Sequence, residues 1–360
     1  MYNLIINTTF NESLLNQINH RLMDVSKYDK IYEKDYRLLE EHIYKYFDYL
    51  TSNFIMFSLN NDLYKVYPSV IKANGDVSAI CIIDNNKIAV AIDAVIGVYN
   101  PKTSASIFAL KGHCNEVTFI HKIDSSKIIS SSLDKTLKVW NLAKKNLIYS
   151  LNTEGTNIGY IFSTPEDSNT FFLVHYFAKY EVINLSDEKN PTVICSKPMT
   201  NENIYDSYDQ LKSGDIICGA KGKIVIFPFN FGNDMTPIKK IGSFDGTPLS
   251  YCELKPMLIA SGLSNGSIFI FDLNNDSERI KMNGHKGGVT GLLKLEENEN
   301  VLVSTSLDCT IRFWNLKTYT CQETFHFEKM EIMFFKKFDN GIMAVATDKQ
   351  VSFWQGRCYK

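Results

Sequence analysis

The chain has 360 residues, of which 44% are hydrophobic and 12% aromatic, so it can bury a large core. Its formal net charge is −2, and this balance provides no global positive field to attract nucleic acid or an anionic membrane surface. The eight cysteines form no C-x-x-C pair and no Cys/His ligand spacing, which favours free thiols in a reducing compartment. No apolar run approaches the length of a membrane span, and the N-terminus lacks the pattern of a secretion signal. We therefore expect a cytoplasmic protein, with the nucleus as the alternative location, that is not secreted.

The first fifty residues follow a helical period. Capping boxes begin at Thr9 and Ser26, each with a hydroxyl three residues before a carboxylate. The pattern predicts an α-helical segment over residues 1–50, ahead of a second domain over residues 51–360. After the second box, apolar and aromatic residues recur at helical spacing, and this stripe either packs on the second domain or docks a partner protein. The candidate contacts of such a docking face are Tyr32, Tyr36, Leu39, Ile43 and Tyr46.

Two later stretches, residues 112–142 and 284–316, are copies of one another. Both run from Gly-His through two apolar runs to Ser-Leu-Asp, and both end in Trp-Asn-Leu. The interval from Asp to Trp is six residues in each copy. Each copy resembles the WD40 repeat, which carries Gly-His near the start of a propeller blade and Trp-Asp at its end.

Weaker copies are found when the Trp position is aligned and the residue six positions upstream is taken as the turn. The spacing between successive Trp positions is 40 to 44 residues, which matches a propeller blade of roughly 40 to 45 residues. The resemblance therefore implies an all-β, seven-bladed WD40 β-propeller behind a short α-helical N-terminal extension. An eighth blade is the alternative, because Phe54 to Tyr67 also reads as two strands. The seven pairs of turn residue and anchor are Asp93 with Tyr99, Asp134 with Trp140, Phe177 with Ile183, Lys221 with Phe227, Asn265 with Phe271, Asp308 with Trp314, and Asp348 with Trp354.

The last blade lacks sequence for an outermost strand, because its last visible strand, Val351 to Trp354, lies close to the C-terminus. A ring of blades avoids open edges by closing on itself. The missing strand must then come from upstream of Gly75. Leu63 to Lys72 and Asn3 to Asn7 are the two candidates.

In the WD40 family, a His, a Ser or Thr, an Asp and a Trp of one blade form a buried chain of hydrogen bonds. The resemblance therefore gives these residue types a structural role rather than a catalytic or metal-binding one. The serine could be either of two in each repeat, Ser130 or Ser132 and Ser304 or Ser306. We assign the two networks to His113, Ser132, Asp134 and Trp140, and to His285, Ser306, Asp308 and Trp314.

The sequence contains no recognisable motif for catalysis or cofactor binding. The segment SLDKTLKVW superficially resembles the S-x-D-x-G-x-x-W box of sialidase-type propellers, but it lacks the glycine and its Asp-Trp interval is one residue longer. No nucleophile elbow, zinc-protease motif or phosphate loop is present. We predict no catalytic residue, no cofactor and no metal, and a propeller hydrolase is the least favoured function.

The resemblance implies that partners bind on one face of the ring. In WD40 propellers the residue before the turn Asp projects from the narrow top face, where partner peptides commonly dock. Four of these residues here are large and apolar or aromatic, and an exposed cluster of them would mark an interaction site. They could instead fold over the centre of the ring and be buried. The four candidates are Ile92, Leu133, Tyr176 and Leu307.

The predicted function is a non-catalytic scaffold or assembly subunit that binds other proteins through the top face and the N-terminal helices. The alternative is a substrate receptor of a cullin-type ubiquitin ligase, because residues 302–317 resemble a sixteen-residue box found in many receptors of cullin-4 ligases. The segment departs from that box at Asn315, where the box has an acidic residue. Neither hypothesis involves direct binding of nucleic acid.

Overall fold

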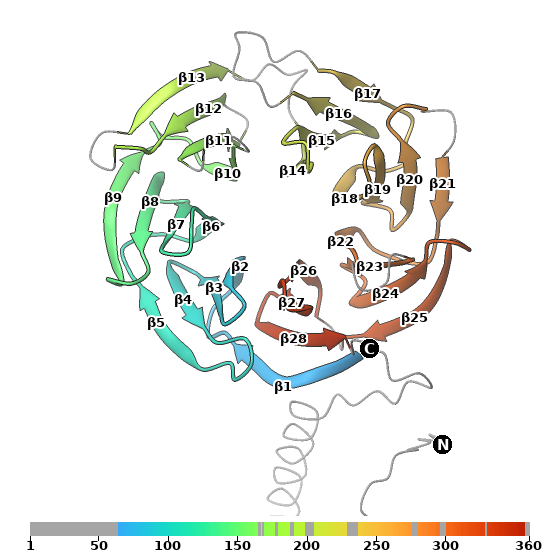
Figure 1. Ribbon diagram of the computed structural model, residues 1–360, viewed down its shortest axis with the longest axis horizontal. Helices are drawn as coiled ribbons and strands as arrows, with labels where there is room; N and C mark the ends of the chain where they lie inside the picture. Colours follow the sequence, from blue (N-terminus) through green and yellow to red (C-terminus); the bar gives the residue numbers. More distant parts are fainter. Residues whose placement is uncertain are drawn as a thin grey trace, which may run out of the picture.

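The computed structural model describes residues 64–164, 167, 169–176, 179–187, 191–198, 205–228, 237–275, 279–295, 300–327 and 330–356. Their regular elements are β-strands, which form seven four-stranded antiparallel sheets arranged as blades in a ring (Figure 1). No helix in this described part could cross a membrane. The prediction of an all-β, seven-bladed propeller is confirmed. The predicted helices over residues 1–50, and with them the tyrosine-rich stripe, lie outside the described residues.

Each blade runs from an innermost strand near the centre of the ring to an outermost strand at its rim. Blade 1 comprises β2 (Val77–Asp84), β3 (Lys87–Ile92), β4 (Val95–Tyr99) and β5 (Ser106–Leu110). Blade 2 comprises β6 (Val117–Lys122), β7 (Lys127–Ser132), β8 (Thr136–Asn141) and β9 (Asn146–Asn152). Blade 3 comprises β10 (Ile158–Ser163), β11 (Thr170–His175), β12 (Lys179–Asn184) and β13 (Thr192–Pro198). Blade 4 comprises β14 (Ser207–Gln210), β15 (Ile216–Ala220), β16 (Lys223–Phe227) and β17 (Lys239–Ile241).

The remaining three blades follow the same order. Blade 5 comprises β18 (Pro248–Lys255), β19 (Leu258–Leu263), β20 (Ile268–Asp272) and β21 (Arg279–Met282). Blade 6 comprises β22 (Val289–Lys294), β23 (Val301–Ser306), β24 (Thr310–Asn315) and β25 (Thr320–His326). Blade 7 comprises β26 (Ile332–Lys337), β27 (Ile342–Thr347), β28 (Gln350–Gly356) and, as its outermost strand, β1 (Tyr64–Lys72).

The apolar core lies between the blades. Each second strand packs on both faces against its neighbours, which explains why these strands read as continuous apolar and small-residue runs. All six residues of β11 and of β27 are buried, for example, whereas three of the five residues of the outermost strand β5 are exposed. Seven apolar clusters fill the seven spaces between adjacent blades of the described residues. Trp140 belongs to the cluster between blades 1 and 2, and Trp314 to the one between blades 5 and 6.

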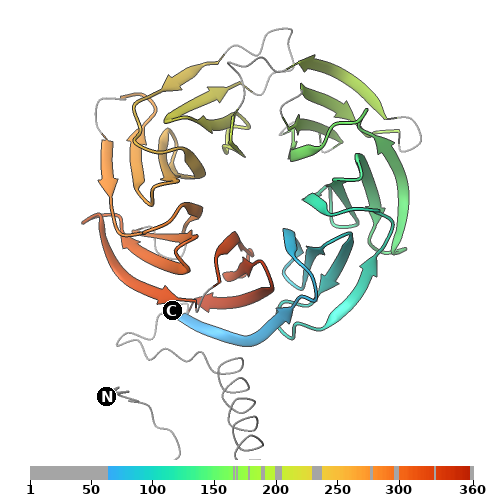
Figure 2. The same ribbon diagram turned by 180° about the vertical axis from the view of Figure 1, so that it is seen from behind.

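The ring closes because β1, from the N-terminal side of the propeller, supplies the fourth strand of blade 7, whose other three strands are C-terminal. β1 pairs antiparallel with β28, with Ile71 opposite Val351, and both figures show it at the rim of blade 7 (Figures 1 and 2). Ile71 is buried in the cluster between blades 7 and 1, and the hydroxyl of Ser69 donates to the carbonyl of Pro101 in blade 1 over 3.0 Å. Of the two closing segments predicted, Leu63 to Lys72 is confirmed.

Shortening Ile71 should loosen the closure of the ring. Ile71→Ala removes buried side-chain volume from the cluster between the first and last blades, so we expect the free energy of unfolding in urea to fall by about 2–5 kcal/mol. Lys72→Ala, at the exposed end of the same strand, is the matched control and should change it by less than about 0.5 kcal/mol. Equal effects of the two changes would show that β1 does not hold the ring closed.

Candidate functional site

The blades give the ring two distinct faces. The innermost strands all run in one direction, because every sheet is antiparallel and has the same strand order. We call the face where the innermost strands begin the top face, and the face where they end the bottom face. The turns between second and third strands lie on the top face, since each second strand runs back from the bottom.

A chain of hydrogen bonds in blade 2 joins the loop before β6 to β7, to β8 and to the turn between them. The indole N–H of Trp140 donates to Ser130 Oγ over 2.8 Å, and Ser130 Oγ lies 2.8 Å from Nε2 of His113. Nδ1 of His113 lies 2.9 Å from a carboxylate oxygen of Asp134. Donors and acceptors match when the neutral imidazole donates its Nδ1 proton to Asp134 and accepts the Ser130 hydroxyl proton at Nε2.

Blade 6 has the same arrangement, built from His285, Ser304, Asp308 and Trp314. The distances are 2.8 Å from indole nitrogen to serine oxygen, 2.6 Å from serine oxygen to Nε2, and 3.0 Å from Nδ1 to the carboxylate. The imidazole side chains of both networks are 0% exposed. These groups are therefore saturated with partners inside the protein, which suits a structural role.

The charge states in the networks are set by burial and hydrogen bonding. Burial raises the pKa of Asp134, but hydrogen bonds from the Thr136 hydroxyl, the Cys114 backbone N–H and His113 outweigh it and lower the pKa from 3.8 to about 2. Burial also lowers the pKa of His113 and His285, against the opposing effect of their carboxylate partners. At neutral pH the aspartate is therefore ionised and the imidazole is neutral, as the network requires.

The assignment of Ser132 and Ser306 to these networks is corrected by the structure. Ser132 Oγ instead donates to the carbonyl of Asn115 over 2.9 Å and accepts the backbone N–H of Asp134 over 3.0 Å. Ser306 makes the equivalent bonds in blade 6. The register explains the difference, because Ser130 pairs with Lys138 and lies diagonally beside Trp140, whereas Ser132 lies at the turn.

Blade 3 carries a different buried polar cluster in the same region. Nδ1 of His175 lies 2.6 Å from the Thr156 hydroxyl, and Nε2 lies 3.1 Å from a carboxylate oxygen of Glu181. The other oxygen of Glu181 forms an ion pair with Lys179 at 2.7 Å. No Gly-His or Trp marks this blade, so the repeat pattern did not predict the cluster. The sequence signal is the Lys-x-Glu pair on one strand beside a histidine that ends the preceding strand.

Hydroxyl groups near the start of the innermost strands form a second set of contacts that the repeat pattern did not predict. In five of the described blades such a hydroxyl donates to the carbonyl at the start of the next innermost strand. Blades 3 and 7 have Gly159 and Met333 at this position. The Val-Ser and Val-Thr pairs at residues 77–78, 117–118 and 289–290 are the signal that could have revealed the pattern. The bonds run from Ser78 to Val117 (2.6 Å), Thr118 to Ile158 (2.9 Å), Ser207 to Pro248 (2.6 Å), Ser250 to Val289 (2.8 Å) and Thr290 to Ile332 (2.6 Å).

The four candidate contact residues lie at or just beyond the ends of second strands, on the top face. Tyr176 is 46% exposed, and Ile92, Leu133 and Leu307 are half-buried. Tyr176 lies flat over the backbone of Gly159, where an added methyl group would come within 2.5 Å of the ring. Met333, 40% exposed at the start of β26, adds an apolar side chain on this face that the turn positions alone could not reveal.

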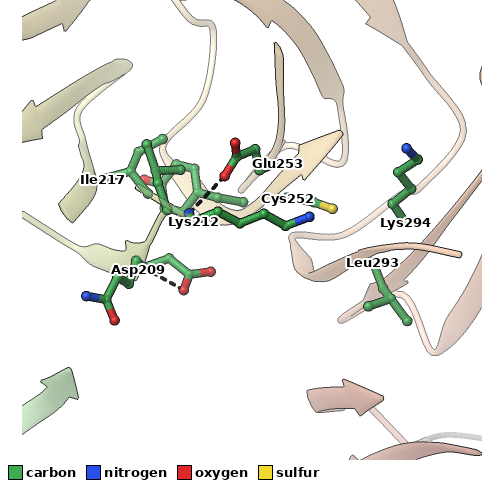
Figure 3. A pocket seen from close by; sticks show the side chains of 10 residues that line it. Asp209, Lys212, Ile217, Cys252, Glu253, Leu293 and Lys294 are labelled. Carbon is green, nitrogen blue, oxygen red and sulfur yellow. Dashed lines mark hydrogen bonds between the residues drawn. The ribbon is translucent and has the colours of Figure 1, made fainter. Parts of the chain in front are cut away.

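One pocket, of about 310 Å³, opens near the bottom end of the innermost strands of blades 4, 5 and 6 (Figure 3). Asp209, Lys212, Glu253 and Lys294 contribute charged groups to its lining, and Cys252 contributes a thiol. Burial raises the pKa of Cys252 to about 11, so the thiol is protonated and a weak nucleophile at neutral pH. Within the described residues, no three His, Cys, Asp or Glu side chains are grouped so that they could hold a metal ion.

Comparison with known proteins agrees with this architecture. The family model "WD domain, G-beta repeat" matches residues 104–141 and 277–315, and these two ranges contain all four residues of the hydrogen-bond networks in blades 2 and 6. The protein is therefore a seven-bladed β-propeller in which blades 2 and 6 match the WD40 repeat.

Several curated proteins are similar to part of the chain, and two of the three described below are named as WD repeat-containing proteins. The chain is 31% identical over 102 residues to the WD repeat-containing protein 89 homolog of Dictyostelium discoideum, which covers 28% of each protein. It is 28% identical over 135 residues to the mouse F-box/WD repeat-containing protein 10, covering 35% of this chain and 12% of that protein. It is 34% identical over 65 residues to the nuclear distribution protein nudF of Aspergillus niger, covering 18% of this chain and 15% of the relative. The chain thus spans between 12% and 28% of the length of these three relatives.

Removing the hydroxyl of the bridging serine should destabilise the protein more than removing the hydroxyl of an exposed serine. Ser130→Ala leaves the Trp140 N–H and a His113 nitrogen without their buried partner, so we expect the free energy of unfolding to fall by about 1–3 kcal/mol. Ser304→Ala should cost about the same, and the two losses should add because the blades are far apart in the ring. Ser125→Ala, in an exposed loop, is the control. A Ser130→Ala protein as stable as the control in urea unfolding would contradict the network.

The buried histidines predict that acid destabilises the protein in two steps. Folded-state pKa values below the ordinary 6.5 mean that the stabilisation is complete above about pH 6.5 and is lost as the pH falls toward the folded-state pKa, by at most about 1.4 kcal/mol per pH unit for each such histidine. Asp134 adds a second loss between its ordinary pKa of 3.8 and its folded value of about 2. Unfolding measured from pH 7 to pH 5 should show this slope. The double variant His113→Gln/His285→Gln should reduce it, leaving the contribution of His121 and His175; an unchanged slope would contradict the assignment.

Proposed function

We propose that the protein is a non-catalytic scaffold or assembly subunit that holds other proteins on the top face of the ring. The observation that carries this proposal is the exposure of Tyr176, a large aromatic side chain that is 46% accessible at the top of blade 3. Tyrosine is enriched at protein interfaces because it combines a large apolar ring with a polar tip and loses little entropy on binding. Leu133, on the neighbouring blade, supplies a half-buried apolar side chain at the equivalent turn.

Rigidity of the turns supports this use of the top face. The backbone N–H of Leu133 donates to the backbone carbonyl of Glu116 over 2.9 Å, and the backbone N–H of Leu307 donates to the backbone carbonyl of Gly288 over 2.9 Å. The aspartates that follow these two leucines belong to the buried networks of blades 2 and 6. A surface held in this way orders few groups on binding, so less of the interaction energy is lost to entropy.

The remaining parts of the proposal rest on the sequence. The N-terminal stripe of Tyr32, Tyr36, Leu39, Ile43 and Tyr46 would offer a second docking surface. A cytoplasmic or nuclear location is supported by the free thiols of the seven described cysteines. The near-neutral net charge supports proteins rather than nucleic acid as partners.

Substitutions that remove apolar side chains from the top face should release partners without unfolding the ring. Leu133→Glu, Leu307→Glu and Tyr176→Ala should each reduce partner recovery in affinity purification with quantitative mass spectrometry, because a truncated contact at the centre of an interface commonly costs more than tenfold in affinity. Tm should fall by no more than a few degrees. Ile107→Glu, on the outermost strand β5 and 42% exposed, is the matched control. Full partner recovery by all three variants, or a loss of Tm in proportion to the loss of partners, would contradict the proposal.

The same purification tests the alternative of a ubiquitin-ligase receptor. Lys317 is exposed in the loop after β24. Asn315, where the receptor box has an acidic residue, accepts the backbone N–H groups of Lys317 (2.8 Å) and Thr318 (3.2 Å) through its side-chain oxygen. A carboxylate could accept the same two bonds, so this departure from the box is compatible with its geometry. A cullin and its adaptor, recovered with the wild-type protein and lost with Lys317→Ala, would favour the receptor; their absence would favour the scaffold.

A further inference from the structure

A buried histidine of blade 3 immediately precedes the exposed Tyr176 of the top face. His175 is the last residue of β11, and its side chain is 0% exposed. The backbone N–H of Tyr176 donates to the carbonyl of Asn157 over 2.8 Å, so the loop that precedes β10 is bonded to blade 3 at this point. A change at His175 therefore lies one residue away from both the loop contact and the exposed ring.

The carboxylate of Glu181 determines which ring nitrogen of the neutral His175 carries the proton. Nε2 lies 3.1 Å from one oxygen of this carboxylate, and the other oxygen pairs with Lys179 at 2.7 Å. An unprotonated Nε2 would direct its lone pair at a negative charge, so the proton is on Nε2. Nδ1 is then the acceptor, and it receives the hydroxyl proton of Thr156 across 2.6 Å.

The hydroxyl of Thr156 has a second acceptor in place. Its oxygen lies 2.8 Å from the backbone carbonyl of Thr153, in the same turn. When Nδ1 of His175 gains a proton, this nitrogen becomes a donor to the Thr156 oxygen, and the hydroxyl proton turns to the Thr153 carbonyl. Each proton of the cluster has an acceptor in both states, so protonation requires the rotation of one hydroxyl group.

The histidines of blades 2 and 6 are less suited to gain a proton. Ser130 Oγ already accepts the N–H of Trp140, and its own hydroxyl proton points at Nε2 of His113. A second proton on this ring would meet that hydroxyl proton, and the Ser130 hydroxyl has no other acceptor among the contacts of the described residues. Ser304 and His285 are arranged in the same way.

The charges around the three histidines also differ. Two carboxylates, Glu181 and Glu154, and one cation, Lys179, act on His175, so the surroundings of the neutral ring carry a net charge of −1. Each network histidine has one carboxylate and one cation nearby, and these charges cancel. A positively charged ring is therefore favoured more strongly at His175 than in the networks. The cancelling pairs are Asp134 with Lys138 in blade 2 and Asp308 with Arg312 in blade 6.

The change of charge at His175 falls in mild acid. Burial lowers the pKa of His175, Lys179 acts in the same direction, and Glu181 and Glu154 oppose both. The turn of blade 2 packs on the same loop through its backbone, because the N–H of Thr153 donates to the Lys135 carbonyl over 2.9 Å, and the Lys135 side chain is exposed. Since the folded-state pKa lies below the ordinary 6.5, His175 is neutral at pH 7 and gains its proton as the pH falls below 6.5.

We propose that His175, Glu181 and Thr156 form a proton-operated switch in blade 3. Proton uptake by His175 moves the Thr156 hydroxyl from the imidazole to the carbonyl of Thr153 and places a positive charge next to Tyr176. The turn that gains this hydrogen bond contains two consecutive residues in the left-handed region, at φ 53° and 84°, so its conformation depends on the bonds that hold it. The switch is a property of the chain alone and is independent of the proposed binding of partners.

NMR titration of the full-length protein with isotope-labelled histidine, from pH 7 to pH 5, tests the switch. His175 should titrate at a higher pH than His113 and His285, and the backbone amide signal of Thr156 should shift with the same midpoint. The histidine signal that is lost in His175→Gln assigns the resonance. Glu181→Gln should lower the pKa of His175 by about one pH unit, because it removes the adjacent negative charge. Glu331→Gln, an exposed glutamate on the top face of blade 7, is the matched control and should leave that pKa unchanged.

Two results would overturn the proposal. The first is a His175 that stays neutral until the protein unfolds, or that titrates at a lower pH than His113 and His285. The second is a titration of His175 that leaves the amide signal of Thr156 unchanged. Glu154→Gln, at an exposed glutamate that pairs with Lys179 at 2.8 Å, keeps the test decisive if Glu181→Gln does not fold. It should lower the pKa of His175 by less than Glu181→Gln does, and an unchanged pKa would also count against the switch.

Discussion

The structure depends on the burial of both faces of every blade. A four-stranded sheet of this size has two apolar faces, and neither can be covered by its own strands. Each blade is therefore stable only between two neighbours, and the seven apolar clusters of the described residues form a closed circle. The pairing of β1 with β28 completes that circle, because without it the last blade would expose an unpaired strand edge.

Closure leaves the two faces of the ring free for different chemistry. On the top face, buried hydrogen-bond networks hold the turns of blades 2 and 6, and Tyr176 and Met333 present apolar surface to solvent. On the bottom face, a pocket is lined by Asp209 and Glu253 together with Lys212 and Lys294.

The sequence was sufficient to predict the fold because the third strand of each blade carries a regular signal. All seven anchor residues lie on third strands, including Ile183, Phe227 and Phe271, whose blades lack the Gly-His and Trp of the strong repeats. Finer detail depended on register. Ser130 and Ser132 point to the same side of one strand, so alternation could not show which of them meets Trp140.

Hydrogen–deuterium exchange on the protein purified with its native partners, compared with the free protein, tests the central claim that the ring presents surfaces to other macromolecules. The account predicts that bound partners slow exchange in the peptides that contain the turns after β7 and β11 on the top face, while the third strands stay equally protected in both states. Exchange that is identical in both states at these turns, with protection confined to the outermost strands, would contradict it.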